Sequence, residues 1–201
     1  MSFQIKIFKG PEILSYIETL ADMRLEAFFE YPYLYVGKRE DELSYVKSYA
    51  LSPQGLLIVA FKNEKIAGIC SGIPLNFENS PLKPWHKKLE KEGLEIEMLY
   101  YGGEIIVKPQ FQKQKACFLL MTQFIEAVKE MKFSKIIGIT CIRAKDHPLC
   151  PPKYFGPESI WEKMGGEKTN IILSSHWSTR QENGSLKKQK NNLAVWIKRL
   201  N

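Results

Sequence analysis

The stretch YYGGEIIVKPQFQKQKACFLLMTQFIEAVKEM spans Tyr100 to Met131 and decides the fold. Residues 104–107 are apolar and β-branched apart from Glu104, which predicts a strand. Pro109 ends this strand, because proline has no N–H group to offer a sheet ladder. From Ala116 onward apolar residues recur at helical spacing, which predicts a helix of roughly four turns. The stretch is therefore interpreted as a strand, a short loop and a helix.

The loop of this stretch, Gln110 to Cys117, has the character of an anion-binding site. The first N–H groups of a helix have no partner within it, and the helix dipole adds partial positive charge at the same end. Lys113 and Lys115 strengthen that charge. We therefore expect an anionic ligand at the start of this helix.

Size and composition indicate a single globular domain over residues 1–201. Hydrophobic residues make up 44% of the chain and aromatic residues 12%, as in ordinary globular proteins. No apolar run approaches the roughly 20 residues of a membrane helix, and Met1 to Gly10 lacks the apolar core of a signal peptide. We expect a cytoplasmic protein without a membrane partner.

Cysteine and histidine spacing does not indicate a metal site. The four cysteines share no C-x-x-C spacing, and without an export signal they are expected to be reduced thiols. The histidines are scattered along the chain. No metal is therefore predicted.

The net charge of +7 favours an anionic partner, and a phosphorylated cofactor, nucleic acid and an acidic surface all compete for that role. The densest basic run is LKKQK, Leu186 to Lys190. No aromatic residues interleave it, so a solvated hairpin loop is favoured over a nucleic-acid patch.

The remaining elements follow from periodicity and turn signals, in the order β-α-α-β-β-β-α-β-α-β-β. The expected strands other than 104–107 are 3–7, 56–61, 66–73, 135–142, 171–177 and 193–197. The expected helices other than the one from Ala116 begin at Pro11, Arg39 and Pro157, with a short one over 85–92 inside a polar insertion.

The central stretch resembles the pyrophosphate-binding motif of the GNAT-type N-acetyltransferase superfamily. That motif is a strand ending in Val-x-Pro, then Arg/Gln-x-x-Gly-x-Gly/Ala, then a helix. Its positions fall here on Val107, Pro109, Gln112, Lys115 and Cys117, so a lysine and a cysteine replace both glycines.

Further features resemble a branch of uncharacterised bacterial proteins in the same superfamily. They are the cluster YPYLY at 31–35, a Tyr-x-Gly-Glu segment at 101–104, a His-Pro-x-x-Pro-x-x-Tyr loop at 147–154, and a Trp-x-x-x-Gly helix end at 161–165. Separated matches in the right order are more specific than one loop. The resemblance implies an α/β (α+β) fold with a mixed central sheet of about seven strands, four to five flanking helices, and a splay between the fourth and fifth strands.

The resemblance also implies acetyl-CoA as co-substrate. The pantetheine arm would lie along the central strand and the pyrophosphate in the loop. The residues implied in binding are Ile105, Ile106, Val107, Gln112, Lys113, Gln114, Lys115, Ala116 and Cys117.

Acyl transfer needs a base for the amine, and Glu104 is the first choice because it is a charged residue on an apolar strand. Alternatively, its side chain faces the outside of the sheet or pairs with a lysine. Many superfamily members protonate the leaving thiol with a tyrosine at the position of Trp161. Since an indole cannot do this, Tyr154, Tyr101 or water would substitute.

Several residues keep two interpretations. His147 either relays protons or is structural, and Tyr154 either donates a proton or packs against the proline loop. Cys117 is either an activated thiol at a helix start or a packing residue. Tyr31, Tyr33 and Tyr35 form either the wall of the acceptor site or part of the core.

These features predict an N-acetyltransferase that moves an acetyl group from acetyl-CoA directly to an amine of an unidentified small molecule or peptide. One alternative is a degenerate member that binds CoA or regulates another protein without catalysis. A second is a nucleic-acid-binding protein, which would need a continuous basic face. The closing strands are also able to pair between chains, which would give a homodimer.

Overall fold

The computed structural model describes residues 2–77, 80 and 82–200, so residues 78, 79 and 81 of the predicted insertion lie outside the described part. The strands are β1 (Gln4–Lys9), β2 (Leu56–Lys62), β3 (Lys65–Pro74), β4 (Leu99–Val107), β5 (Lys135–Cys141), β6 (Glu167–Arg180) and β7 (Leu186–Arg199). The α-helices are α1 (Ile17–Phe29), α2 (Arg39–Leu51), α3 (His86–Lys91), α4 (Ala116–Glu130) and α5 (Pro157–Lys163).

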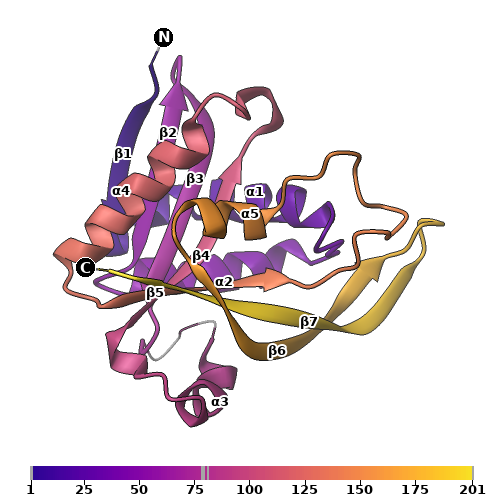
Figure 1. The fold of residues 1–201 in the computed structure, drawn as a ribbon. Coiled ribbons are helices and arrows are strands. Elements are labelled where there is room, and N and C mark those ends of the chain that lie inside the picture. Colours follow the sequence, from indigo (N-terminus) through magenta and orange to yellow (C-terminus); the bar gives the residue numbers. More distant parts are fainter. Residues whose placement is uncertain (1, 78–79, 81, 201) are drawn as a thin grey trace.

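The strands form one open mixed sheet in the order β1-β2-β3-β4-β5-β7-β6 (Figure 1). The β4–β5 pair is parallel, and the other neighbouring pairs are antiparallel. Helix α4 connects the two parallel strands, as a parallel crossover requires. The predicted α/β sheet of seven strands is confirmed.

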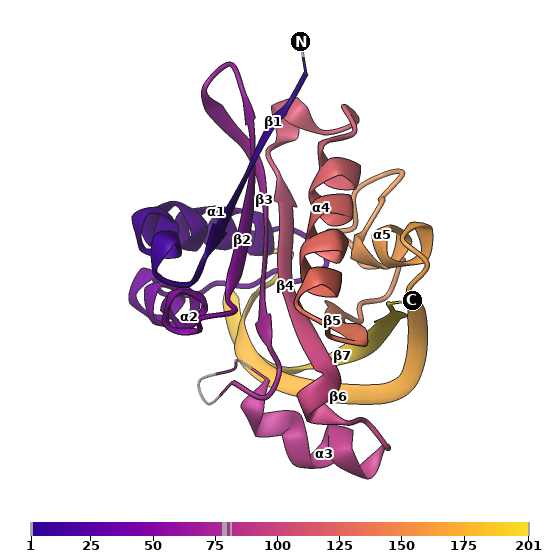
Figure 2. The same cartoon turned by 90° about the vertical axis from the view of Figure 1, so that its left-hand side faces the viewer.

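Helices cover both faces of the sheet (Figure 2). Helices α1 and α2 pack on one face over a core that includes Leu57, Ile69 and Ile137. Helix α4 packs on the other face through Leu120 and Phe124, and residues of α5 join the same cluster. Each fully buried side chain of this size contributes about 1.5–3 kcal/mol. The predicted apolar stripe of α4 is thus the face that meets the sheet.

The structure corrects three sequence-based expectations. The helix predicted from Pro11 begins as a 3-10 helix, Gly10–Tyr16, in which the Glu12 carboxylate accepts from the Lys9 N–H group. The last two strands are much longer than predicted. The run from Leu186 to Lys190, expected in a loop, belongs to β7. Its mostly exposed residues lie in a two-stranded ribbon, which explains why its sequence lacks an apolar pattern.

The outer edge of β6 is partly covered by the same chain. Trp85 donates to the Ser174 carbonyl at 3.3 Å, Lys88 donates to the Ile172 carbonyl, and Tyr35 bridges to Thr179. Strands β6 and β7 pair with each other within one chain. Among the described helices, none is both long and apolar enough to cross a bilayer.

Candidate active site at the parting of two strands

Strands β4 and β5 pair only where they begin. Tyr101 and Ile137 form the last of three pairs, although β4 continues to Val107 and β5 to Cys141 (Figure 1). Both continuing segments lie within the described residues. The sheet therefore splays between its fourth and fifth strands, as the resemblance implied.

A bulge in β4 lies where the strands part. Ser71 of β3 pairs with Glu104 while Gly72 pairs with Gly102, so Gly103 has no partner. A Cβ atom at Gly103 would overlap the Tyr49 hydroxyl, so glycine is needed here. Bulges bend a strand and increase its twist, which turns β4 away from its neighbour.

The bulge also decides which backbone groups of β4 face β5. After the bulge, the Lys108 N–H donates to the Ala67 carbonyl on β3, so the backbone N–H and C=O groups of even-numbered residues point toward β3. Before the bulge, the Leu75 N–H donates to the Leu99 carbonyl, so there the backbone groups of odd-numbered residues point toward β3. Alternation then places the backbone groups of residues 103, 105 and 107 on the edge toward β5. Of the predicted arm-binding residues, Ile105 and Val107 lie on this edge, whereas Ile106 faces its partner on β3.

Strand β5 presents a matching edge. The Ile142 N–H donates to the Asn192 carbonyl, and the Leu200 N–H donates to the Ser134 carbonyl. Even-numbered residues of β5 therefore bond to β7, and the backbone groups of Ile139 and Cys141 point toward β4. Two unpaired strand edges thus face each other.

The loop before α4 retains the backbone shape of a glycine-rich loop without glycine. Lys113 and Lys115 have φ angles of 62° and 67°, in the left-handed region that glycine adopts at no cost. Among the described residues, no acceptor is bonded to the main-chain N–H groups of 113–118. The Gln112 side chain donates to the Val107 carbonyl and the Gln114 side chain to the Gln110 carbonyl, which fixes the loop.

The two residues that replace glycines in this loop differ in exposure. The Lys115 side chain is exposed to solvent. Cys117 is half-buried, and burial raises the pKa of its thiol to about 11, so the thiol keeps its proton at neutral pH. The N–H groups, the lysine charge and the two strand edges fit the diphosphate and the amide-bearing arm of CoA.

Glu104 lies beneath α1 and α2, and its side chain has no exposed surface. Its carboxylate forms an ion pair with Arg24 and accepts a hydrogen bond from the Ser71 hydroxyl. The Tyr49 hydroxyl lies 3.2 Å and 3.1 Å from the two carboxylate oxygens. The side chain therefore faces inward, and its ionic partner is an arginine.

Arg24 joins Glu104 to a second buried carboxylate, that of Glu42. Its guanidinium lies 3.8 Å from the ring centre of Tyr45. Burial works against the charge of Arg24, but Tyr45 and Glu42 outweigh that effect, and the pKa of Arg24 lies above its ordinary value. Arg24 was missed in the sequence, although a charged residue on the apolar stripe of a predicted helix was a detectable signal.

A chain of tyrosine hydroxyls leads away from Glu104. Tyr49 lies 3.3 Å from Tyr45, which lies 3.3 Å from Tyr101, oxygen to oxygen. Burial raises the pKa of both Tyr49 and Tyr101, so these phenols keep their protons at neutral pH. The chain connects Glu104 to the residue at which β4 and β5 part.

The three tyrosines between α1 and α2 all use their hydroxyls within the protein. Tyr31 donates to the Ala144 carbonyl at 3.0 Å, and Tyr35 donates to Glu42 at 2.7 Å. Tyr33 lies 3.5 Å from the Ile139 carbonyl, on the unpaired edge of β5.

His147 and Tyr154 meet at Tyr31. The Tyr154 ring lies edge-on to it at 4.7 Å, and the His147 ring centre is 6.0 Å away. His147 Nδ1 accepts from the Leu149 N–H at 3.1 Å, and burial with the nearby Arg143 lowers its pKa. In the described part of the chain, no hydrogen bond or ring contact joins these residues to Glu104.

Trp161 of α5 packs as a core residue. Its indole stacks on Trp196 with ring centres 6.5 Å apart, and a Cβ atom at Gly138 of β5 would overlap it. The tyrosine expected at this position in many superfamily members is thus replaced by a packing residue.

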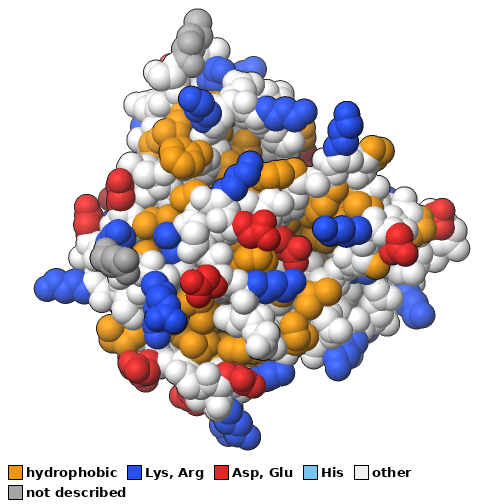
Figure 3. Space-filling model, in the orientation of Figure 1, with side chains coloured by type: hydrophobic (Ala, Val, Ile, Leu, Met, Phe, Trp, Pro, Cys, Tyr) orange, Lys and Arg blue, Asp and Glu red, His pale blue; other side chains and the backbone are white. Residues whose placement is uncertain are grey.

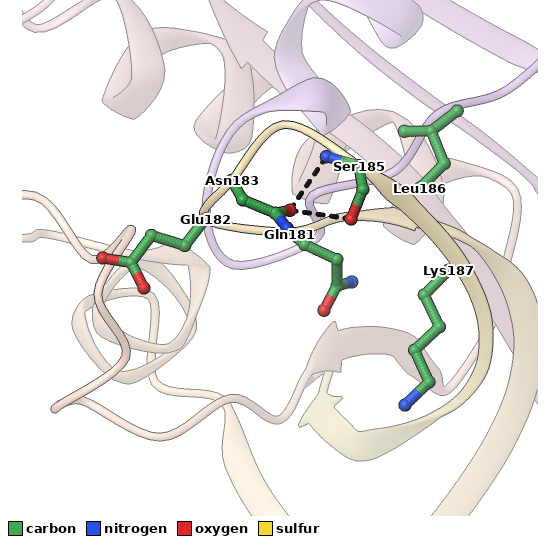
Figure 4. A pocket seen from close by; sticks show the side chains of 6 residues that line it. All are labelled: Gln181, Glu182, Asn183, Ser185, Leu186 and Lys187. Carbon is green, nitrogen blue, oxygen red and sulfur yellow. Dashed lines mark hydrogen bonds between the residues drawn. The ribbon is translucent and has the colours of Figure 1, made fainter.

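Two other features of the described surface do not indicate a binding site. A hollow of about 590 Å³ at the β6–β7 turn has mainly polar walls, and the Asn183 side chain there bonds back to Ser185 (Figure 4). Lysine and arginine side chains on the face in Figure 3 are interspersed with acidic ones. Within residues 2–77, 80 and 82–200, no three His, Cys, Asp or Glu side chains gather as metal ligands.

Solved structures share the architecture at low sequence identity. An N-acetyltransferase from Staphylococcus aureus Mu50 superposes with a TM-score of 0.61 at 11% identity over 100% of both chains. The yncA protein from Salmonella typhimurium, solved with its cofactor acetyl-CoA, gives 0.59 at 10% over 100% of this chain and 95% of the other. The ribosomal-protein-S18-alanine N-acetyltransferase from Escherichia coli gives 0.56 at 12%, over 99% and 94%.

A search of curated protein sequences finds no match. The sequence model of the acetyltransferase (GNAT) family matches residues 17–151, which include the loop, the parting strands and the buried glutamate. The chain therefore belongs to the GNAT acetyltransferase family.

Proposed function

We propose that this protein transfers the acetyl group of acetyl-CoA directly to an amine of a small molecule or peptide. The observation that carries the proposal is the parting of β4 and β5 after Tyr101 and Ile137, next to a loop with unbonded N–H groups. Extended backbone edges suit an amide-bearing arm, and a helix start suits a diphosphate.

In this proposal acetyl-CoA supplies an activated acyl thioester, and the chain holds it. The edge of β4 at Gly103, Ile105 and Val107 binds the arm, and the N–H groups of 113–118 bind the diphosphate, with Lys113 and Lys115 adding charge. A backbone N–H on the edge at the bulge is placed to stabilise negative charge on a carbonyl oxygen.

Glu104 is proposed as the base that takes up the proton lost by the amine. Because its carboxylate has no exposed surface, it receives a proton only through another group, and the Tyr49–Tyr45–Tyr101 hydroxyls supply that connection. His147 and Tyr154 are proposed on the acceptor side, where they enclose Tyr31.

A second candidate function is CoA binding without turnover. Two observations favour it: Arg24 neutralises Glu104, and Trp161 cannot donate a proton to a leaving thiol. The two candidates share the cofactor and differ in product formation.

Calorimetry and thermal unfolding with CoA and acetyl-CoA test binding. A ligand at 100 times its Kd stabilises a protein by about 2.7 kcal/mol. Lys115→Glu should weaken binding about tenfold or more by placing a carboxylate at the loop. Lys132→Glu is the matched control, since Lys132 is also an exposed lysine with a left-handed φ angle, 65°, but follows the other end of α4.

Binding of neither compound at millimolar concentration, or equal weakening by the two variants, would overturn the proposed cofactor site. Thiol release from acetyl-CoA in the presence of a panel of amines and amino-terminal peptides then separates the candidates. Acetylated product supports the transferase, and tight binding without product supports the binding module.

A further inference from the structure

The leaving sulfur of a thioester needs a group that stabilises its negative charge. On α5, the position at which many superfamily members carry a tyrosine holds Trp161 in this chain. Its indole packs on Gly138 and Trp196. An indole has a single N–H donor, fixed in its ring plane, and cannot supply a proton to a thiolate. Another side chain must therefore reach the end of the strand opening.

Tyr33 is that side chain by position. It comes from the segment between α1 and α2, packs against Phe28 with ring centres 4.6 Å apart, and carries its hydroxyl to 3.5 Å from the Ile139 carbonyl. Ile139 is two residues beyond Ile137, the last residue of β5 that pairs with β4, and its carbonyl faces the opening. The hydroxyl therefore lies close to where the two strands separate.

The bond made by this hydroxyl is weak. A distance of 3.5 Å is at the outer end of the range for an O–H donor, whose usual distance to oxygen is about 2.7–2.8 Å. Tyr31 and Tyr35, by contrast, have bonds of 3.0 Å and 2.7 Å. Tyr33 thus loses little by turning its O–H toward a better acceptor.

We propose that the Tyr33 hydroxyl donates a hydrogen bond to the sulfur of CoA and stabilises it as the leaving thiolate. This role rests on the proposed acetyl transfer. As the amine nitrogen bonds to the acetyl carbon, the carbon–sulfur bond breaks and its electron pair stays on sulfur beside the Tyr33 O–H. The proton lost by nitrogen finally returns to sulfur, so the amide and the thiol account for all atoms without another reactant.

The surroundings suit a donor that keeps its own proton. Burial and the neighbouring Cys141 raise the pKa of Tyr33, whereas Arg24 lowers it, and the net direction is upward. Tyr45 and Tyr154 also lie near this phenol. Tyr33 therefore stays protonated while the thiolate carries the charge.

The test uses CoA itself and needs no known acceptor. The full-length protein is saturated with CoA that carries carbon-13 next to sulfur, and the chemical shift of that carbon is followed as the pH is raised. We expect the bound thiol to ionise about one pH unit lower than free CoA, the effect of one charge-assisted hydrogen bond. Tyr33→Phe should raise the bound thiol pKa by about that amount, because it removes one oxygen and keeps the ring packing.

Two controls keep the proposal falsifiable. Tyr100→Phe removes a buried hydroxyl on the face of the sheet that α4 covers, where it donates to the Gln54 carbonyl. This variant should leave the thiol pKa unchanged. Tyr154→Phe removes the phenol hydroxyl near Tyr33, and it should change the pKa of the bound thiol less than Tyr33→Phe does.

An unshifted thiol in the wild-type complex would overturn the role of Tyr33 even if the variant failed to fold. Equal values for wild type and Tyr33→Phe, or a larger effect of Tyr154→Phe, would do the same. Failure of wild-type protein to bind CoA is a separate outcome that rejects the proposed function, and the Tyr33 role with it.

Discussion

Arg24 holds two buried carboxylates together, those of Glu42 and Glu104. Charges removed from water are costly unless they are paired, so the group depends on the cation that both carboxylates share. Its net charge is one negative unit, and the hydroxyls of Tyr35, Tyr49 and Ser71 offset part of that charge. The balance among these residues sets how each tolerates substitution.

Arg24→Met should be much more damaging than Glu104→Gln. The first leaves two carboxylates buried without a cation and should cost about 3–5 kcal/mol in the free energy of unfolding. The second leaves Arg24 paired with Glu42 and should cost less than about 2 kcal/mol. Urea unfolding measures both, and equal losses would contradict this account. Adding Glu104→Gln to Arg24→Met should recover part of the loss.

Cys117 should make the fold less stable at alkaline pH. Its thiol has an ordinary pKa of 9.0, and burial raises it to about 11 in the folded chain. Between those values the unfolded chain has lost the proton that the folded chain keeps, so stability falls as the pH rises. Cys117→Ala should reduce that fall relative to wild type when urea unfolding is compared at about pH 8 and about pH 10. Parallel curves for the two proteins would exclude a contribution from this thiol.

At the scale of elements, the bulge in β4 connects strand geometry to side-chain packing. Gly103 leaves room for the Tyr49 hydroxyl that bonds to Glu104, and the same residue turns the β4 backbone toward the opening. A substitution at Gly103 should therefore alter both the packing of Tyr49 and the course of the β4 backbone.

Gly103→Ala should destabilise the protein by about 1–3 kcal/mol, because the added methyl group overlaps the Tyr49 hydroxyl. The matched double variant, Gly103→Ala with Tyr49→Phe, removes the overlapping oxygen. It should be more stable than the sum of the two single changes predicts, as measured by thermal unfolding in a double-mutant cycle. Strict additivity would mean that the hydroxyl does not restrict this position.

The central elements could be predicted from sequence because their signals are local. Pro109, the helix start at Ala116 and the stripe through Leu120 and Phe124 each depend on neighbours a few residues away, and the structure confirms them. The lengths of β6 and β7 could not be predicted, because their outer halves form a ribbon with polar residues on both sides.

The site was predictable in part. Glu104 was singled out as a charge on an apolar strand, but its partner Arg24 lies 80 positions away in the chain and is fixed only by tertiary packing. The left-handed angles of Lys113 and Lys115 were also hidden, since lysine rarely takes a conformation that glycine adopts readily. Residue-type patterns locate a loop, whereas its backbone shape follows from the contacts around it.

At the scale of the whole molecule, the net charge of +7 should assist binding of a polyanion such as CoA. The Kd for CoA should rise as the salt concentration is raised from about 50 mM to about 500 mM, since the Debye length shrinks to a few ångströms. Pantetheine lacks the phosphates, so its Kd should hardly change. Calorimetry with both ligands measures the difference, and equal salt dependence would show that phosphate charge contributes nothing.

The short β4–β5 pairing also has a consequence for how amide protons exchange with solvent. Beyond Ile137, the N–H groups of Gly138 and Thr140 bond to β7, while those of Ile139 and Cys141 are turned to the opening. Deuterium uptake should therefore be slow at Gly138 and Thr140 and fast at Ile139 and Cys141. Saturation with CoA should slow the exchange at the two fast positions, because the pantetheine arm would shield them from solvent.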